Sequence, residues 1–185
     1  MKIKPTTRRG GVVMELDRRD DRLLEKSAKA AEAAPFKLKE ILVPIDFSES
    51  SLKALHYALP LAEKFGARVT LINVIEPRFS PEEMMMPSEM LELKSELVKG
   101  AWDRLETLAH EAIKPAITST TAVEVGRPYE EIVAAAKKHK TDLIIIATHG
   151  RTGLRHFLIG STAERVVRHA PCPVLTVRER EHDFV

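Results

Sequence analysis

The chain has 185 residues, which allows one domain with a substantial core and is short for two. Hydrophobic residues make up 44% and charged residues 30%, a balance typical of a folded globular domain, which excludes a disordered or membrane-embedded chain. The 29 basic and 27 acidic residues nearly cancel, which excludes the strongly basic surface that nucleic-acid-binding domains use.

The first segment, residues 1–36, is rich in Arg, Lys, Asp, Glu and Ala and ends beside Pro35. Leucines and alanines between positions 16 and 31 form only a narrow apolar stripe on a helix. We therefore expect a charged N-terminal extension that is partly ordered or helical, and both a loose tail and a partner-docking helix fit this composition. The domain itself should span residues 37–180, followed by a tail over 181–185.

After Pro35, short apolar runs alternate with longer segments of helical periodicity, which indicates a parallel sheet covered on both faces. The predicted strands cover residues 40–45, 68–75, 118–125, 142–147 and 173–177. The predicted helices run from the cap Ser48 to the stop at Gly66, and then over residues 88–114, 128–138 and 160–169. Right-handed crossovers place the five strands in one open α/β sheet, and such sheets bind ligands at the carboxyl ends of their strands.

Two of the helices carry apolar stripes that predict their buried faces. In the first helix the stripe contains Leu52, Leu55, Leu59 and Ala62. In the second it contains Met90, Leu93, Leu97, Ala101, Leu105 and Leu108. Between them, residues 76–87 hold three prolines and Met84-Met85-Met86, so we expect a loop that serves as an apolar lid, a dimer contact or a simple connection.

The segment that carries chemistry joins the fourth strand to the last helix. It reads Ala147-Thr148-His149-Gly150-Arg151-Thr152-Gly153 and, after six residues, Gly160-Ser161-Thr162. Gly150 permits a tight turn, and the helix that follows presents unpaired N–H groups and the positive end of its dipole. Such a helix start binds anions, and the hydroxyl groups of Ser161 and Thr162 add donors. The alternative is a tight turn followed by an ordinary helix cap.

Over residues 38–178 the chain resembles the universal stress protein family. The nucleotide-binding branch of that family holds ribose and phosphates with Gly-x-x-Gly, nine residues, and Gly-Ser/Thr. Gly150, the nine residues 151–159 and Gly160-Ser161 match the second half of this motif. The segments Pro44-Ile45-Asp46-Phe47-Ser48, 163–167 and 170–175 also resemble the family. The resemblance implies a Rossmann-like sheet, similar to the adenine-nucleotide alpha hydrolases, with strand order 3-2-1-4-5.

The ligand implied by this resemblance is ATP, with Mg²⁺ held on its phosphates rather than by protein side chains. Asp46 would lie against adenine or ribose, Val74 and Val125 would line the base, and Gly126 would keep the approach open. The full set of implied nucleotide-binding residues is Pro44, Ile45, Asp46, Val74, Val125, Gly126, Ala147, Thr148, His149, Gly150, Arg151, Gly153, Gly160, Ser161 and Thr162. The alternatives are a turn or cap role for Asp46, a core role for the valines and an exposed loop position for His149.

One position departs from the family motif, because Ala147 stands where the motif has its first glycine. If that position needs a left-handed backbone, alanine costs about 1–2 kcal/mol, roughly a tenfold loss of affinity or somewhat more. If it needs only a small side chain in an extended strand, the change is nearly neutral. We expect the extended strand, since Ala147 ends a run of β-forming residues.

These features predict an ATP-binding universal stress protein, a stress-response module with slow or no hydrolysis, because no Walker A lysine motif is present. It would be at most a weak ATPase. Alternatives are a dimeric interaction module without nucleotide, and a binder of AMP or cyclic AMP. An adenylate-transferring enzyme is less favoured, since the His-x-Gly-His and Ser-Gly-Gly-x-Asp-Ser signatures are missing.

The resemblance also implies a homodimer formed through the last strand, Val174 to Val177, and an unidentified protein partner. A single cysteine, Cys172, excludes an intrachain disulfide and is consistent with a reducing compartment. The longest aliphatic run, 143–147, is far too short to span a bilayer. We expect a cytoplasmic protein with neither membrane nor nucleic-acid partners.

Overall fold

The structure is a computed structural model that describes residues 2–5, 12–15, 37–76, 87–148, 160–178 and 182. The chain divides into two compact units, Met1–Lys37 and Leu38–Val185. The first unit contains two strands, β1 (Lys2–Pro5) and β2 (Val12–Glu15), which pair antiparallel. These strands were not predicted, since the composition of residues 1–36 indicated a tail or a helix. The apolar stripe predicted between positions 16 and 31 lies outside the described residues.

The second unit is built on a five-stranded parallel sheet of order β5-β4-β3-β6-β7. Its strands are β3 (Glu40–Pro44), β4 (Arg68–Ile75), β5 (Ser119–Val125), β6 (Leu143–Ala147) and β7 (Val174–Val177). Counted within this sheet, the order is 3-2-1-4-5, as predicted. Every predicted strand is present with its ends within one residue of the predicted ones, so the fold class is confirmed.

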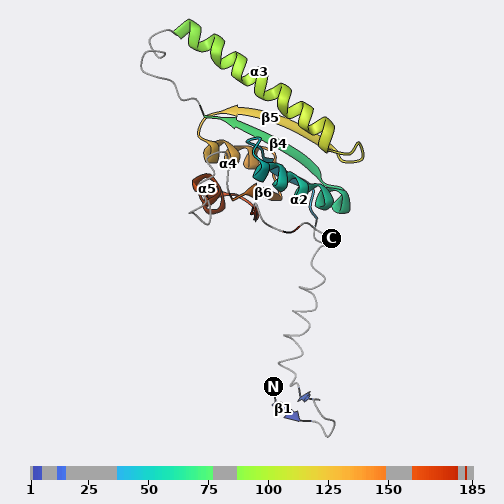
Figure 1. The fold of residues 1–185 in the computed structure, drawn as a ribbon. Coiled ribbons are helices and arrows are strands. Elements are labelled where there is room, and N and C mark those ends of the chain that lie inside the picture. Colours follow the sequence, from blue (N-terminus) through green and yellow to red (C-terminus); the bar gives the residue numbers. More distant parts are fainter. Residues whose placement is uncertain are drawn as a thin grey trace. The chain divides into compact units, whose positions relative to one another are not determined.

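Four helices cover the two faces of this sheet (Figure 1). They are α2 (Glu49–Phe65), α3 (Pro87–Ala112), α4 (Pro128–Lys138) and α5 (Ser161–His169). Alternate residues of a strand point to opposite faces, so Ile41 and Val43 pack with α2 and α3, whereas Leu42 packs with α4 and α5. None of the described helices is both long enough and apolar enough to cross a membrane.

The ends of α2 are those that the sequence predicts. The Ser48 hydroxyl accepts a hydrogen bond from the Ser51 N–H at 3.2 Å, and Gly66 ends the helix in a left-handed conformation with φ 64°. The predicted stripe is only partly right, because Leu55 is buried while Leu52 is 39% exposed. The buried face is made by smaller residues as well: Ser51, Ala54, Ala58 and Ala62.

Helix α3 lies along β4 and β5 and is much longer than either strand (Figure 1). Its 26 residues extend about 39 Å, against roughly 26 Å for the eight residues of β4. Leu105 is therefore fully buried near the carboxyl end of the helix, whereas Leu97, predicted to be buried, is 46% exposed. The structure describes the backbone of Met90 and Leu93 but not their side chains.

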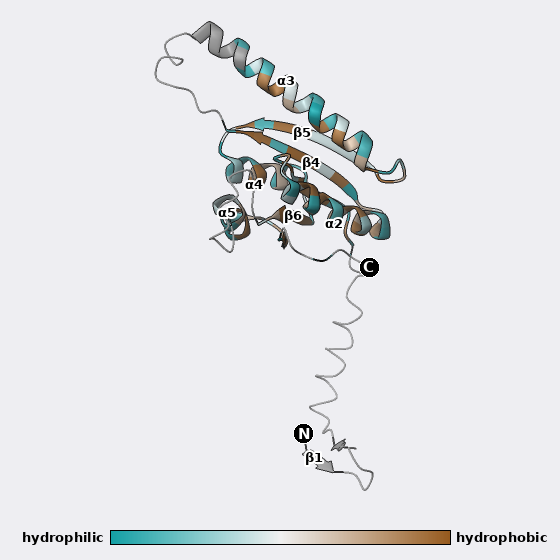
Figure 2. Cartoon of the chain, in the orientation of Figure 1, coloured by the Kyte–Doolittle hydropathy of each residue, from teal (hydrophilic) through white to brown (hydrophobic). Residues whose placement is uncertain are grey.

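Strand β5 forms one edge of the sheet, and its residues are all partly exposed except Thr120, which is exposed. Figure 2 shows hydrophilic as well as hydrophobic residues along it. The opposite edge is β7, which pairs only with β6 within the described sheet. Strand β7 has the sequence Val-Leu-Thr-Val and contains no charged residue. The two edges therefore differ in composition, and an apolar edge strand is open to pairing with another chain.

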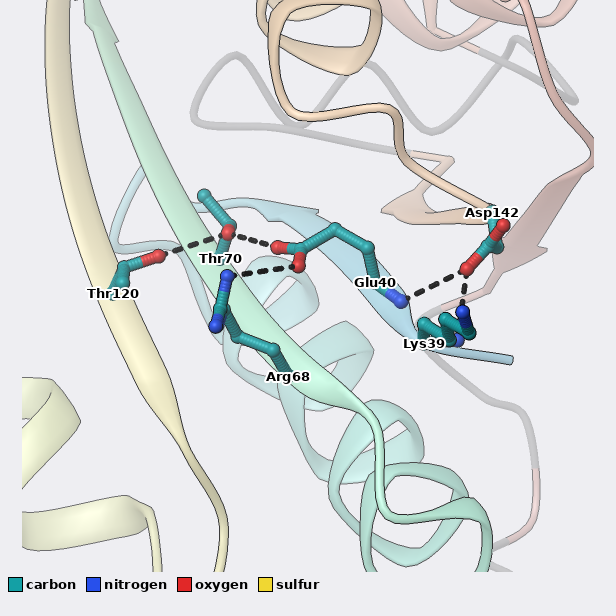
Figure 3. A network of polar contacts seen from close by, with 6 residues as sticks. All are labelled: Lys39, Glu40, Arg68, Thr70, Thr120 and Asp142. Carbon is teal, nitrogen blue, oxygen red and sulfur yellow. Dashed lines mark hydrogen bonds and ion pairs between the residues drawn. The ribbon is translucent and has the colours of Figure 1, made fainter. Parts of the chain in front are cut away.

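A polar network ties the amino ends of the strands together (Figure 3). The Thr70 hydroxyl donates to Oε1 of the buried Glu40 at 2.5 Å and lies 2.9 Å from the Thr120 hydroxyl. Arg68 Nη1 lies 3.7 Å from the other oxygen of Glu40. Asp142 Oδ2 accepts hydrogen bonds from the backbone N–H groups of Lys39 and Glu40, at 2.8 and 3.0 Å. The network therefore links β3, β4 and β5 to the turn before β6.

Pairing between β3 and β6 is confined to the amino halves of these strands. The register joins Ile41 to Leu143 and Leu42 to Ile144, whereas β3 and β4 are paired as far as Pro44 and Ile72. The direction in which strands are added to the sheet reverses between β3 and β6. The carboxyl ends of these two strands are therefore the place where a sheet of this type binds its ligand.

Candidate functional site

The loop after β3 is held by side chains that fix its backbone. Ile45 is buried, its N–H donates to the Ile72 carbonyl at 2.8 Å, and its own carbonyl accepts from the Asn73 amide at 2.7 Å. Asp46 Oδ1 accepts from the Ser48 N–H at 3.0 Å and from the Ser48 hydroxyl at 2.5 Å. This oxygen of Asp46 therefore stabilises the turn, which is the alternative role considered for it from the sequence.

Phe47, in the middle of this loop, has a left-handed backbone with φ 63°. Such a conformation is unusual for a bulky residue and is maintained only where the surrounding structure imposes it. Here the guanidinium of Arg104 on α3 lies 4.0 Å from the centroid of the Phe47 ring. The loop after β3 lies beside the place where the strand order reverses. It is thus held by α2 through Ser48 and by α3 through Arg104.

The ends of β4 and β5 lie beside each other. Val74 packs against the core cluster on the α4 side, and Val125 is the half-buried last residue of β5. The Gly126 N–H donates to the Ile75 carbonyl at 3.0 Å, which continues the pairing one residue beyond β5. A Cβ atom on Gly126 would lie 2.4 Å from Oε1 of Glu131, so glycine permits the close approach of that carboxylate.

Ala147 is the last residue of β6 and pairs with Val177. Among the described non-glycine residues, only Phe47 and Lys140 have positive φ, so Ala147 has the extended backbone that the sequence favours. Thr148, which is buried, donates its N–H to the Val177 carbonyl at 2.8 Å and accepts from the Gly160 N–H at 2.6 Å. This bond fixes the start of α5 beside the end of β6.

The start of α5 has no side-chain cap. Its N-cap Gly160 has φ −67° and ψ 152° and forms no side-chain hydrogen bond. Ser161 is exposed and Thr162 is half-buried in the first turn. Helix α4 begins in the same way, with N-cap Arg127 making no side-chain cap and Pro128 in the first turn. Both helices therefore start without the side-chain acceptor that usually binds their first N–H groups.

A cavity of about 430 Å³ lies at these two helix starts. It is lined by Glu76, Arg127, Pro128, Tyr129, Ser161, Thr162 and Arg165. Two of these residues, Ser161 and Thr162, are predicted site residues, and the other five were not predicted. Glu76 comes directly after β4, Arg127 comes two residues after β5 and Arg165 comes one turn after Ser161, so their positions relative to these elements were the available signal.

Tyr129 connects the basic residues of this cavity. Its hydroxyl donates to Glu130 Oε1 at 2.7 Å, and the same oxygen lies 3.4 Å from Arg127 Nη1. The hydrogen bond to Glu130 is the main cause that raises the pKa of Tyr129, since the phenol must stay protonated to donate it. The guanidinium of Arg165 lies over the aromatic ring of the same tyrosine, 5.1 Å from the ring centroid.

Four predicted residues of the glycine-rich segment, His149, Gly150, Arg151 and Gly153, lie outside the described residues, as do Met84 to Met86. In the described ranges, no group of three or more His, Cys, Asp or Glu side chains could hold a metal ion. The structure thus brings together Thr148, Gly160, Ser161 and Thr162 at the end of β6. Asp46, Val74, Val125 and Gly126 lie at or just after the carboxyl ends of β3, β4 and β5.

The model of the universal stress protein family matches residues 37–178. The chain belongs to this family. Universal stress protein MJ0531 of Methanocaldococcus jannaschii is 39% identical over 142 residues, which cover 76% of this chain and 82% of that protein. Membership accounts for the fold and the sheet order.

Solved structures of universal stress proteins have the same fold. The structure of MJ0577, from the same organism, has a TM-score of 0.65 and 31% identity and is matched over 80% of this chain and all of that chain. Universal stress protein UspA from Lactobacillus plantarum has a TM-score of 0.63 and 29% identity, matched over 78% of this chain and all of that one. The additional residues of this chain therefore lie mainly outside the shared domain.

Proposed function

We propose that this universal stress protein binds an adenine nucleotide, with ATP and Mg²⁺ as the preferred ligand, and presents a nucleotide-dependent surface to a partner in the stress response. The observation that carries the proposal is the start of α5, which has no side-chain cap and borders the cavity. The hydrogen bond from the Gly160 N–H to the Thr148 carbonyl fixes it beside the end of β6. Unpaired N–H groups, two hydroxyls and a positive dipole end are the donors that phosphate requires.

The surroundings of the helix start support the same assignment. The cavity, at about 430 Å³, falls in the size range of small-ligand pockets. Ala147 lies in an extended strand, so its replacement of the motif's first glycine needs no left-handed backbone and gives no reason to expect a nucleotide-free protein. ATP would supply the phosphates that the donors bind, and the bound Mg²⁺ would reduce their negative charge.

The proposal includes a homodimer formed through β7. This strand is four residues long, ends the sheet order and is composed of Val174, Leu175, Thr176 and Val177. Its first three residues are partly exposed, and an apolar edge without charged residues favours pairing with a second copy. Pairing there would leave the carboxyl ends of the strands open to nucleotide.

The test begins with the small molecule released when the purified protein is denatured, identified by mass spectrometry. Calorimetric titration of the emptied protein with ATP, AMP and cyclic AMP, each with Mg²⁺, then measures affinity. Gly160→Val should abolish binding and leave the melting temperature of the empty protein within a few degrees, because φ −67° and ψ 152° are open to any L residue. Retained affinity in this variant would contradict the role of the helix start.

A further inference from the structure

The turn between β3 and α2 depends on an unusual backbone conformation at Phe47. Its φ of 63° lies in the left-handed region, which glycine adopts freely and bulky residues avoid. This turn brings the N–H and the hydroxyl of Ser48 back to Asp46 Oδ1, at 3.0 and 2.5 Å. The same Ser48 caps α2 by accepting from the Ser51 N–H. The conformation of Phe47 therefore determines where Asp46, a predicted nucleotide-binding residue, lies relative to β3 and α2.

Two kinds of contact hold the Phe47 side chain. The ring packs against the core cluster that contains Ile45 and Leu105. It also contacts the guanidinium of Arg104 on α3, which lies 4.0 Å from the ring centroid. A cation within about 6 Å of the face of an aromatic ring is attracted by the negative charge of that face. Core packing and a cation–π contact from α3 therefore act together on one residue of the turn.

Arg104 makes this contact from a fixed part of α3. Its neighbour Leu105 is fully buried, so the helix backbone is anchored at this point. Arg104 itself is exposed, and the ion pairs among the described residues do not include it. The planar guanidinium is suited to stacking on an aromatic face. Replacing Arg104 should therefore loosen the turn at Phe47 and leave the core intact.

We propose that Arg104 is a positioning residue for the nucleotide, because its contact with Phe47 stabilises the left-handed turn that places Asp46 at adenine or ribose. The inference rests on the proposed function, in which Asp46 contacts the nucleoside part of the ligand. Arg104 acts through Phe47 rather than by contact with the ligand. The phosphates bind at the start of α5, a different element, so their binding should not depend on Arg104.

The experiment is calorimetric titration of the full chain with ATP and with inorganic tripolyphosphate, which lacks base and ribose, at fixed Mg²⁺ and ionic strength. Arg104→Gln should weaken ATP binding about fivefold and leave tripolyphosphate affinity within about 1.5-fold of the parent. Arg104→Lys should restore most of the ATP affinity, because an ammonium group over the ring keeps the cation–π contact.

The role of the ring is tested by Phe47→Leu, which keeps an apolar side chain for the core and removes the aromatic face. This variant should lose about as much ATP affinity as Arg104→Gln, and the double variant should lose no more than either single variant, because both remove the same contact. Additive losses in this double-mutant cycle would overturn the inference.

The matched control is Lys99→Gln, which removes one positive charge from an exposed position on the same helix. Its ATP affinity should equal that of the parent, and the melting temperatures of all empty variants should stay close to that of the parent. Unchanged ATP binding in Arg104→Gln, or equal losses for ATP and tripolyphosphate, would overturn the inference and leave the proposed nucleotide binding intact. A parent protein that binds no nucleotide would instead contradict the proposed function itself.

Discussion

Replacing Thr70 by Val tests the polar network at the amino ends of the strands. The substitution keeps the shape of the side chain and removes the hydroxyl that donates to Glu40 at 2.5 Å. Thr70 is 1% exposed and Glu40 8% exposed, so water cannot take the place of the lost donor. The remaining contact of Glu40 with Arg68 spans 3.7 Å, and the Arg68 side chain is 54% exposed.

A hydrogen bond to a charged acceptor contributes about 1.5–3 kcal/mol, whereas an exposed ion pair contributes under about 1 kcal/mol. We therefore expect Thr70→Val to lower the free energy of unfolding by about 2 kcal/mol. For a domain of this size, such a loss corresponds to a melting temperature about 4–8 °C lower. The measurement is urea denaturation at pH 7, with the slope of the free energy against urea unchanged.

The matched control is Thr120→Val, which removes the exposed partner hydroxyl of the same network and should change the free energy of unfolding by no more than about 0.5 kcal/mol. A double-mutant cycle with Glu40→Met, which removes the acceptor and keeps an unbranched side chain, isolates the interaction between Thr70 and Glu40. Equal effects of Thr70→Val and Thr120→Val, or a cycle with no coupling energy, would refute the assignment of Thr70 as the hydroxyl that stabilises the buried carboxylate.

Two further predictions concern packing and ionisation. Leu105→Ala should destabilise the protein by about 2–5 kcal/mol, whereas Leu97→Ala on the same helix should cost under about 0.5 kcal/mol; similar losses in urea denaturation would show that the first half of α3 is packed. Burial raises the pKa of the Cys172 thiol above its ordinary 9.0, so the reactive thiolate is less populated at pH 8 in the folded than in the unfolded protein. Alkylation of this single cysteine by iodoacetamide should therefore have a pH midpoint higher in the folded state; a lower midpoint would contradict the burial.

Local signals predicted much of the fold. Runs of β-branched residues define β4 and β6, and Ser48, Gly66 and Pro128 mark helix ends through their own backbone chemistry. The exposure of Leu97 was not predictable from periodicity, because it depends on how far α3 extends past β4 and β5. The two short strands of the first unit were missed because four residues carry a weak alternation signal.

The candidate site was predictable at the start of the last helix. Gly160, Ser161 and Thr162 were predicted from the residues that open this helix and from the family motif, and the structure has α5 beginning there. The extended backbone of Ala147 agrees with the preceding β-forming residues. The left-handed conformation of Phe47 could not be predicted, since bulky residues avoid it unless tertiary contacts such as that with Arg104 impose it. Arg165 and Tyr129 meet only because α4 and α5 are neighbours, which the order of elements does not specify residue by residue.

The limited pairing between β3 and β6 affects where the native sheet opens locally. Strands β5, β4 and β3 share extensive ladders, as do β6 and β7, whereas only Ile41 and Leu42 of β3 pair with β6. The Asp142 carboxylate closes this junction at its amino end by accepting from Lys39 and Glu40. This junction has fewer ladder pairs than those beside it, although both core clusters pack across it. We therefore expect amide hydrogen exchange to be faster at the carboxyl halves of β3 and β6 than in β4. A ligand that bridges the ends of β3 and β6 would slow that exchange in both strands.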